Sequence, residues 1–154
     1  MSVQDDKRTF TGMDMLRYYL LKTEPFDLNV VWNKIFKLDL FNGVEPVRFP
    51  KGRVQEDNFT IFRLFLNANS IVTVNEPLYY YVQRAGSIMA NFTRRFMIDT
   101  IESYMYMSDY LMNHCSSVKN ELQLYLLNSY VELSRRVCAN KCKKECNDLL
   151  IQYK

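Results

Sequence analysis

The sequence contains few of the residues that break regular structure or bind metal. Its 154 residues include only four glycines and four prolines, which excludes collagen-like and linker-like chains. With one histidine and four cysteines, the chain has few of the side chains that usually bind transition metals. The formal net charge is only +3, without the marked basic excess typical of nucleic-acid-binding proteins, so no nucleic-acid partner is expected.

Long apolar segments are also missing. There is no run of 18 apolar residues, so no transmembrane helix is expected. Residues 1–6 lack the basic-then-apolar pattern of a signal peptide, so we expect a cytoplasmic protein. Peripheral contact with an acidic membrane is the alternative, because five basic residues cluster near the C-terminus: Arg135, Arg136, Lys141, Lys143 and Lys144. A solvated basic face is the simpler interpretation of that cluster.

Apolar and aromatic residues are plentiful. Hydrophobic residues make up 48% of the chain, and 11 tyrosines and 10 phenylalanines raise the aromatic share to 14%. A chain of this length is about the size of one domain and can bury its own core. The aromatic content indicates either an aromatic-rich core or a surface that meets a partner.

The pattern of the chain changes near residue 90. Thr11 and Asp14 fit a helix start, and Met15, Leu16, Tyr19 and Leu20 repeat at helical spacing. Before residue 90 we expect extended segments over 29–36, 71–74 and 78–83, a helical turn over 37–41, a helix over 56–67 and a turn over 84–87. After it we expect helices over 96–113, 118–137 and 138–153. The predicted fold class is therefore α/β followed by an α-helical C-terminal tail, mostly helical overall with a few short strands.

Four motifs follow one another in the first part of the chain. They are Val31-Trp32-Asn33-Lys34-Ile35-Phe36, Arg48-Phe49-Pro50-Lys51-Gly52, Gln55-Glu56-Asp57, and Tyr79-Tyr80-Tyr81-Val82-Gln83-Arg84-Ala85-Gly86-Ser87-Ile88. In this order and at these spacings they resemble the acceptor-side, C-terminal half of family 2 glycosyltransferases with the GT-A fold. Many members of that family are bacterial enzymes of polysaccharide biosynthesis. The resemblance implies that residues 1–90 are the acceptor-side part of a GT-A-like domain and residues 91–154 a helical extension.

The resemblance also implies a reaction. Asp57 would be the general base that takes a proton from the acceptor hydroxyl while its oxygen attacks the anomeric carbon of a nucleotide sugar, inverting that centre. Glu56 would support it. We expect the helix N-terminus at this point to keep Asp57 ionised. Plain helix capping is the alternative interpretation of Glu56-Asp57.

Further residues are assigned to substrate binding by the same resemblance. Arg84 is the best candidate for a phosphate contact, since its fork of donors matches phosphate oxygens. Donor or acceptor contacts are also implied for Trp32, Lys34, Tyr81, Gln83 and Ser87, against the alternatives of a core tryptophan and a solvated lysine. Family members often carry Arg or His where this chain has Val82, a departure that removes one polar contact.

The chain contains no Asp-x-Asp motif, whose carboxylates hold Mg²⁺ or Mn²⁺ on the diphosphate in the resembled family. We therefore expect no cofactor in this chain and a metal ion only in the complete enzyme, whose nucleotide-binding N-terminal half would be a missing partner. The hypothesis is a truncated or split glycosyltransferase that is inactive alone. The alternative is a non-catalytic docking module derived from that fold.

Cysteines provide one more candidate site. Cys138, Cys142 and Cys146 are spaced one helical turn apart, and Cys115 follows His114. Sulfurs in a straight helical row are too far apart to share one metal ion without distortion. Free thiols are the preferred interpretation, and nearby lysines would raise their reactivity.

Overall fold

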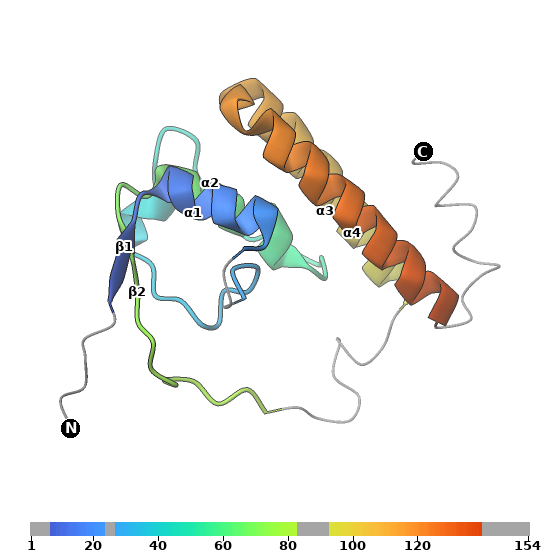
Figure 1. Cartoon of the computed structure of the whole chain (residues 1–154), viewed down its shortest axis with the longest axis horizontal. Coiled ribbons are helices and arrows are strands. Elements are labelled where there is room, and N and C mark those ends of the chain that lie inside the picture. The colour runs from blue at the N-terminus through green and yellow to red at the C-terminus, as the bar shows by residue number, and fades with distance from the viewer. Residues whose placement is uncertain (1–6, 24–26, 83–92, 140–154) are drawn as a thin grey trace.

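A computed structural model describes residues 7–23, 27–82 and 93–139 of the chain. These form a mostly helical structure beside a small antiparallel sheet (Figure 1). In chain order the elements are β1 (Arg8–Phe10), α1 (Gly12–Leu21), the 3₁₀ turn η1 (Leu38–Phe41), α2 (Glu56–Asn67), β2 (Ile71–Thr73), α3 (Arg94–His114), the 3₁₀ turn η3 (Ser116–Val118) and α4 (Lys119–Ala139). Among the described residues no helix is both long enough and apolar enough to cross a membrane.

Helix α1 begins where the sequence indicates. The Thr11 hydroxyl accepts a hydrogen bond from the Asp14 N–H at 3.1 Å, and the Asp14 carboxylate accepts one from the Thr11 N–H at 3.4 Å. This reciprocal capping satisfies two otherwise free donors. The predicted apolar stripe of Met15, Leu16, Tyr19 and Leu20 is buried in the core.

Helices α1 and α2 approach very closely at one end. A Cβ atom on Gly12 would lie 2.0 Å from the Phe65 carbonyl oxygen and 2.3 Å from that of Ala68. The first turn of α1 therefore rests directly on the last turn of α2. Strand β1 precedes α1 and β2 follows α2, and the two strands pair antiparallel with Phe10 opposite Ile71.

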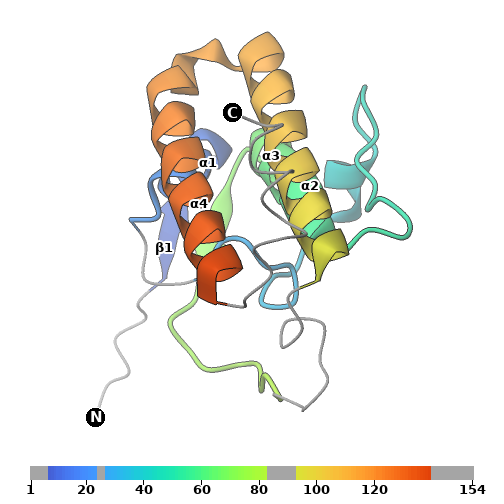
Figure 2. The same cartoon turned by 90° about the vertical axis from the view of Figure 1, so that its right-hand side faces the viewer.

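Helices α3 and α4 form a hairpin that covers the first pair. Figure 2 shows the two long helices side by side, joined at one end through η3. Helix α3 packs on α2 and α4 packs on α1. The shared core includes Leu16, Phe62, Met107 and Leu122, contributed by all four helices.

The predicted extended segment over 29–36 is wrong. Instead the chain is irregular there, with a turn at Trp32 and Asn33. Three hydrogen bonds hold the loop in this shape. The Lys34 ammonium donates to the carbonyls of Asp27 and Val30, and the Val31 N–H donates to the carboxylate of the distant Asp57. β-Branched residues favour a strand only where a neighbouring strand is available to pair with, and none is used here.

Other expectations are confirmed in part. The turn over 37–41, the helix over 56–67, the strand at 71–73 and the long helices after residue 93 are all present, and β1 was not predicted. Residues 78–82 are not assigned to a strand, and Cys138 and Ala139 end α4 rather than beginning a new helix. The rest of the predicted helix over 138–153, with Cys142 and Cys146, lies outside the described residues.

The turn over 84–87 and the boundary near residue 90 also lie outside the described residues. The division of the chain into residues 1–90 and 91–154 therefore stays a prediction.

Candidate functional site

The Glu56-Asp57 pair lies in the first turn of α2, as predicted. The preceding residue, Gln55, has a left-handed backbone with φ of 64°, and Gly52 shortly before it has φ of 70°. These two conformations turn the chain sharply into the helix. Asp57 is thereby directed toward the loop over 27–36, where its Oδ2 accepts a hydrogen bond from the Val31 N–H at 3.2 Å.

The second oxygen of Asp57 is enclosed by the surrounding chain. Oδ1 is buried and has no hydrogen-bond partner within the described part of the chain. Burial raises the pKa of Asp57 above its usual value, and the neighbouring charge of Glu56 raises it further. The Val31 N–H and Lys34 lower this pKa only in part. The helix N-terminus therefore does not lower the pKa of this carboxyl, because desolvation outweighs the favourable donors. That Asp57 is ionised stays a prediction.

Lys34 is fixed in the same loop rather than solvated. Its Nζ donates to the Asp27 carbonyl at 3.1 Å and to the Asn33 Oδ1 at 2.6 Å, in addition to the Val30 carbonyl. Burial lowers the pKa of Lys34 to about 8, against the opposing pull of Asp27 and Asp57. At neutral pH this ammonium is therefore charged and contributes a positive potential at Asp57.

Trp32 is not a core residue. It is 39% exposed, and its indole stacks on Tyr79 and Tyr81 with ring centroids 4.8 and 5.0 Å away. The structure thus brings Trp32, Lys34 and Asp57 into one region through the loop over 27–36, and it joins Tyr81 to that region through the stack. Gln83, Arg84 and Ser87 lie outside the described residues.

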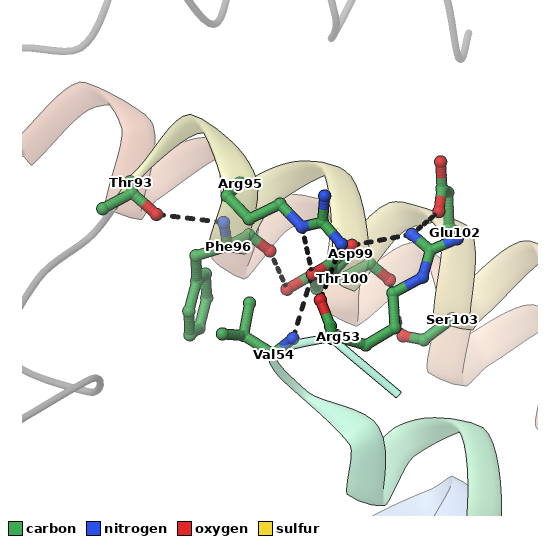
Figure 3. A network of polar contacts seen from close by, with 10 residues as sticks. Arg53, Val54, Thr93, Arg95, Phe96, Asp99, Thr100, Glu102 and Ser103 are labelled. Carbon is green, nitrogen blue, oxygen red and sulfur yellow. Dashed lines mark hydrogen bonds and ion pairs between the residues drawn. The ribbon is translucent and has the colours of Figure 1, made fainter. Parts of the chain in front are cut away.

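One residue that supports this region was missed by the sequence analysis. Asp99, on α3, has no exposed surface, and Figure 3 shows the donors that converge on it. Its Oδ1 accepts from Arg53 at 2.7 Å, and its Oδ2 accepts from the Val54 N–H at 2.9 Å and from Arg95 at 2.8 Å. The spacing of Arg95 and Asp99 on a helix could have indicated one ion pair, but the approach of Arg53 had no signal in the sequence.

The Asp99 network holds the turn that leads into α2. Arg53 also pairs with Glu102, and Arg95 also donates to the Gly52 carbonyl at 2.8 Å. Burial alone would raise the pKa of Asp99. The hydrogen bonds from Arg53, the Val54 N–H and Arg95 together hold it below its usual value. An ionised Asp99 thus anchors residues 52–54 to α3, three residues before Asp57.

No cluster of three or more His, Cys, Asp or Glu side chains suited to a metal ion occurs among the residues that the structure describes. Cys115 is buried and Cys138 is exposed, and both are free thiols.

Comparison with known proteins gives two similar sequences. No known protein-family profile matches the chain. A region of 56 residues is 45% identical to the glycosyltransferase GlyG of Streptococcus pneumoniae, covering 36% of this chain and 18% of GlyG. A region of 108 residues is 26% identical to the glycosyltransferase GlyA of the same organism, covering 70% of this chain and 15% of GlyA. The aligned regions span less than a fifth of either relative, and they relate this chain by weak homology to glycosyltransferases.

Proposed function

We propose that this chain is the acceptor-side part of an inverting family 2 glycosyltransferase with a GT-A fold, and that Asp57 is its general base. The observation that carries the proposal is the state of Asp57. One carboxylate oxygen is fixed by the Val31 N–H, the other is buried and unpartnered among the described residues, and the pKa is raised. A carboxylate that only caps a helix would use its oxygens on the free N–H groups of that helix. Similarity to GlyG and GlyA supports the same class of function.

The proposed step needs only one base. The acceptor oxygen forms a bond to the anomeric carbon of the donor sugar while the bond from that carbon to the nucleoside diphosphate breaks. The proton of the acceptor hydroxyl passes to Asp57, and the leaving diphosphate carries away the bonding electrons. A raised pKa makes Asp57 a stronger base than an ordinary carboxylate, which favours this transfer at neutral pH.

The described residues do not form a binding site for Mg²⁺ or Mn²⁺. They contain no suitable cluster of ligands, and the whole sequence has no Asp-x-Asp. The proposal therefore assigns any such ion, and most of the nucleotide-sugar contacts, to a nucleotide-binding half supplied by another part of the protein or by a partner. Within this chain Lys34 holds a positive charge close to Asp57, and Glu56 raises the pKa of Asp57 as a like charge.

The test compares Asp57→Asn with Asp109→Asn, an exposed aspartate on α3. Both variants are made in the 154-residue chain. Each is assayed together with a nucleotide-binding half, which is either fused to the chain or added as a separate protein. We expect Asp57→Asn to lower turnover at least about 100-fold, the usual contribution of a general base, and Asp109→Asn to leave it unchanged. Equal turnover by the two variants would contradict the role of Asp57. Calorimetry on the chain alone should show no saturable binding of UDP-sugars, and such binding would contradict the acceptor-side assignment.

A docking module is the second candidate function. This function is favoured by apolar side chains that are exposed to solvent. Ile35 and Val44 are fully exposed, and Tyr80 is almost fully exposed. A protein that shows no turnover with any nucleotide-binding half, yet binds another protein through these residues, would support it.

Location and membrane contact also stay proposals. We propose a cytoplasmic protein that meets lipid-linked acceptors at an acidic membrane surface, supported by Arg135 and Arg136 on the last turns of α4. Co-sedimentation with anionic vesicles that is lost at high salt would support this contact, and its absence at low salt would contradict it.

A further inference from the structure

Three aromatic side chains form one stack at the surface. The indole of Trp32 lies within 5.0 Å of the ring centroids of Tyr79 and Tyr81, at an interplanar angle of 28° in both cases. Trp32 belongs to the loop over 27–36, and the tyrosines belong to the segment that follows β2. In Figure 1 this segment runs below the body of the molecule, on the same side as that loop. The stack joins two segments that share no ladder of backbone hydrogen bonds among the described residues.

The stack is ordered by its own contacts but remains open to solvent. Tyr79 and Tyr81 are 54% and 49% exposed, and Trp32 is 39% exposed. Rings in the core of this protein are different, since Tyr19, Phe62 and Tyr125 are all almost completely buried. Exposed aromatic groups held in a fixed arrangement are typical of surfaces that bind a ligand.

Polar groups lie next to the stack on the same loop. Asn33 and Lys34 follow Trp32 directly, and Val31 precedes it and donates its N–H to Asp57. The aromatic surface is therefore one residue away from the backbone group that fixes the candidate base. A ligand resting on these rings would lie beside a loop whose Asn33 and Lys34 side chains are held in place by hydrogen bonds and whose Val31 N–H holds Asp57. Apolar walls beside a few polar groups are typical of ligand sites.

We propose that the Trp32–Tyr79–Tyr81 stack is the platform on which the pyranose ring of the acceptor sugar rests. This inference depends on the proposed function, because Asp57 then acts on a hydroxyl of that same sugar. One face of a pyranose carries C–H groups, whose slight positive charge suits the negative face of an aromatic ring, while its hydroxyls point outward to polar partners. A nucleobase would also stack on such rings, but it brings no sugar hydroxyl to Asp57.

The single tryptophan of the chain makes a direct experiment available. Trp32 is the only source of indole fluorescence and of an indole N–H signal in NMR spectra. The full chain is titrated with methyl β-glucopyranoside, methyl β-galactopyranoside, cellobiose and lactose, with sorbitol as an acyclic control and uridine monophosphate as the nucleobase probe. We expect at least one pyranoside to change both signals saturably and sorbitol to change neither.

Neighbouring tyrosines supply matched variants. Tyr79→Leu and Tyr81→Leu should each weaken pyranoside binding about 2- to 10-fold, the usual value of one aromatic contact. Tyr80→Leu should leave binding unchanged, since Tyr80 is 93% exposed and lies between the two stacked residues. Thermal unfolding of each variant shows whether it is folded.

The outcomes separate this proposal from the proposed function. The platform is overturned if no pyranoside changes the fluorescence or the indole N–H signal, if Tyr80→Leu weakens binding as much as Tyr79→Leu, or if only uridine monophosphate binds. Asp57→Asn should retain pyranoside binding. If the platform binds sugar but Asp57→Asn keeps full turnover in the assembled enzyme, the proposed base is wrong while the platform stands. If turnover depends on Asp57 and no pyranoside binds, only the platform is wrong.

Discussion

At the scale of single residues, the ionised carboxyl of Asp57 lowers the free energy of unfolding, as is common for functional residues. Its pKa is higher in the folded chain than in the unfolded chain, so the ionised carboxyl destabilises the fold at any pH above the folded value. The penalty shrinks as the pH falls through that value and is gone below the unfolded pKa, because the folded state takes up the proton first. Residues selected for catalysis often carry such a penalty.

Asp57→Asn should therefore raise the free energy of unfolding at neutral pH. The amide oxygen of asparagine can still accept the Val31 N–H bond, while the buried charge and its repulsion with Glu56 are removed. Urea unfolding of wild type and variant at several pH values is the measurement. The advantage of the variant should shrink on acidification, and a variant less stable than wild type at neutral pH would contradict this explanation.

Asp99 has the opposite linkage. Its pKa is lower in the folded chain than in the unfolded chain, so its ionised form stabilises the fold above the unfolded value, about 3.9. This stability is lost as the pH falls through the folded pKa. Asp99→Asn removes the charge that satisfies Arg53, Arg95 and the Val54 N–H. We expect it to cost about 3 kcal/mol at neutral pH, the usual penalty for breaking a buried charged contact.

The matched control for Asp99→Asn is Asp109→Asn on the exposed face of α3, which should change stability by less than about 0.5 kcal/mol. In urea unfolding the difference between wild type and Asp99→Asn should close at low pH. A difference that persists unchanged under acid conditions would mean that Asp99 acts through packing rather than through its charge.

At the scale of elements, the contact between α1 and α2 depends on a missing side chain. A methyl group on Gly12 would collide with the backbone oxygens of Phe65 and Ala68, which a rotamer change cannot relieve. Gly12→Ala should lower the free energy of unfolding by about 1–3 kcal/mol or more, although alanine is the better helix former. Chemical unfolding measures this loss. Gly43→Ala serves as the control, since the nearest atom to its added Cβ is the end of the Asn67 side chain at 3.9 Å, and an equal loss there would contradict the packing argument.

The elements also show which parts of the structure local sequence determines. The start of α1 was predictable because its capping residues are three positions apart in the sequence, and the existence of the long helices α3 and α4 was predictable too. The loop over 29–36 was not, because its Val, Trp and Ile residues favour a strand while its conformation is set by Asp57, 26 residues away from Val31. The placement of Asp57 at the start of α2 followed from sequence, but its raised pKa followed only from the loop that buries it.

At the scale of the whole molecule, a cluster of buried tyrosines connects the first helices to the hairpin. Tyr19 on α1 and Tyr125 on α4 stack with centroids 5.3 Å apart and share a hydrogen bond of 3.2 Å between their hydroxyls. Tyr104 on α3 packs edge-on against Tyr125. Burial raises the pKa of both Tyr19 and Tyr125, so the hydroxyls stay protonated and can donate. Three helices therefore meet at one polar contact inside an apolar core.

A double-mutant cycle at this contact tests whether the helices form one cooperative unit. Tyr19→Phe and Tyr125→Phe should each cost about 1–2 kcal/mol, because each removes the hydrogen bond between the two buried hydroxyls. The double variant should cost less than the sum of the two by about 1 kcal/mol, since the shared hydrogen bond can be lost only once. Urea unfolding followed by Trp32 fluorescence and by helical circular dichroism should give coincident transitions for all variants. Strict additivity would show that the two hydroxyls do not interact, and separate transitions would show that the hairpin of α3 and α4 unfolds independently of α1 and α2.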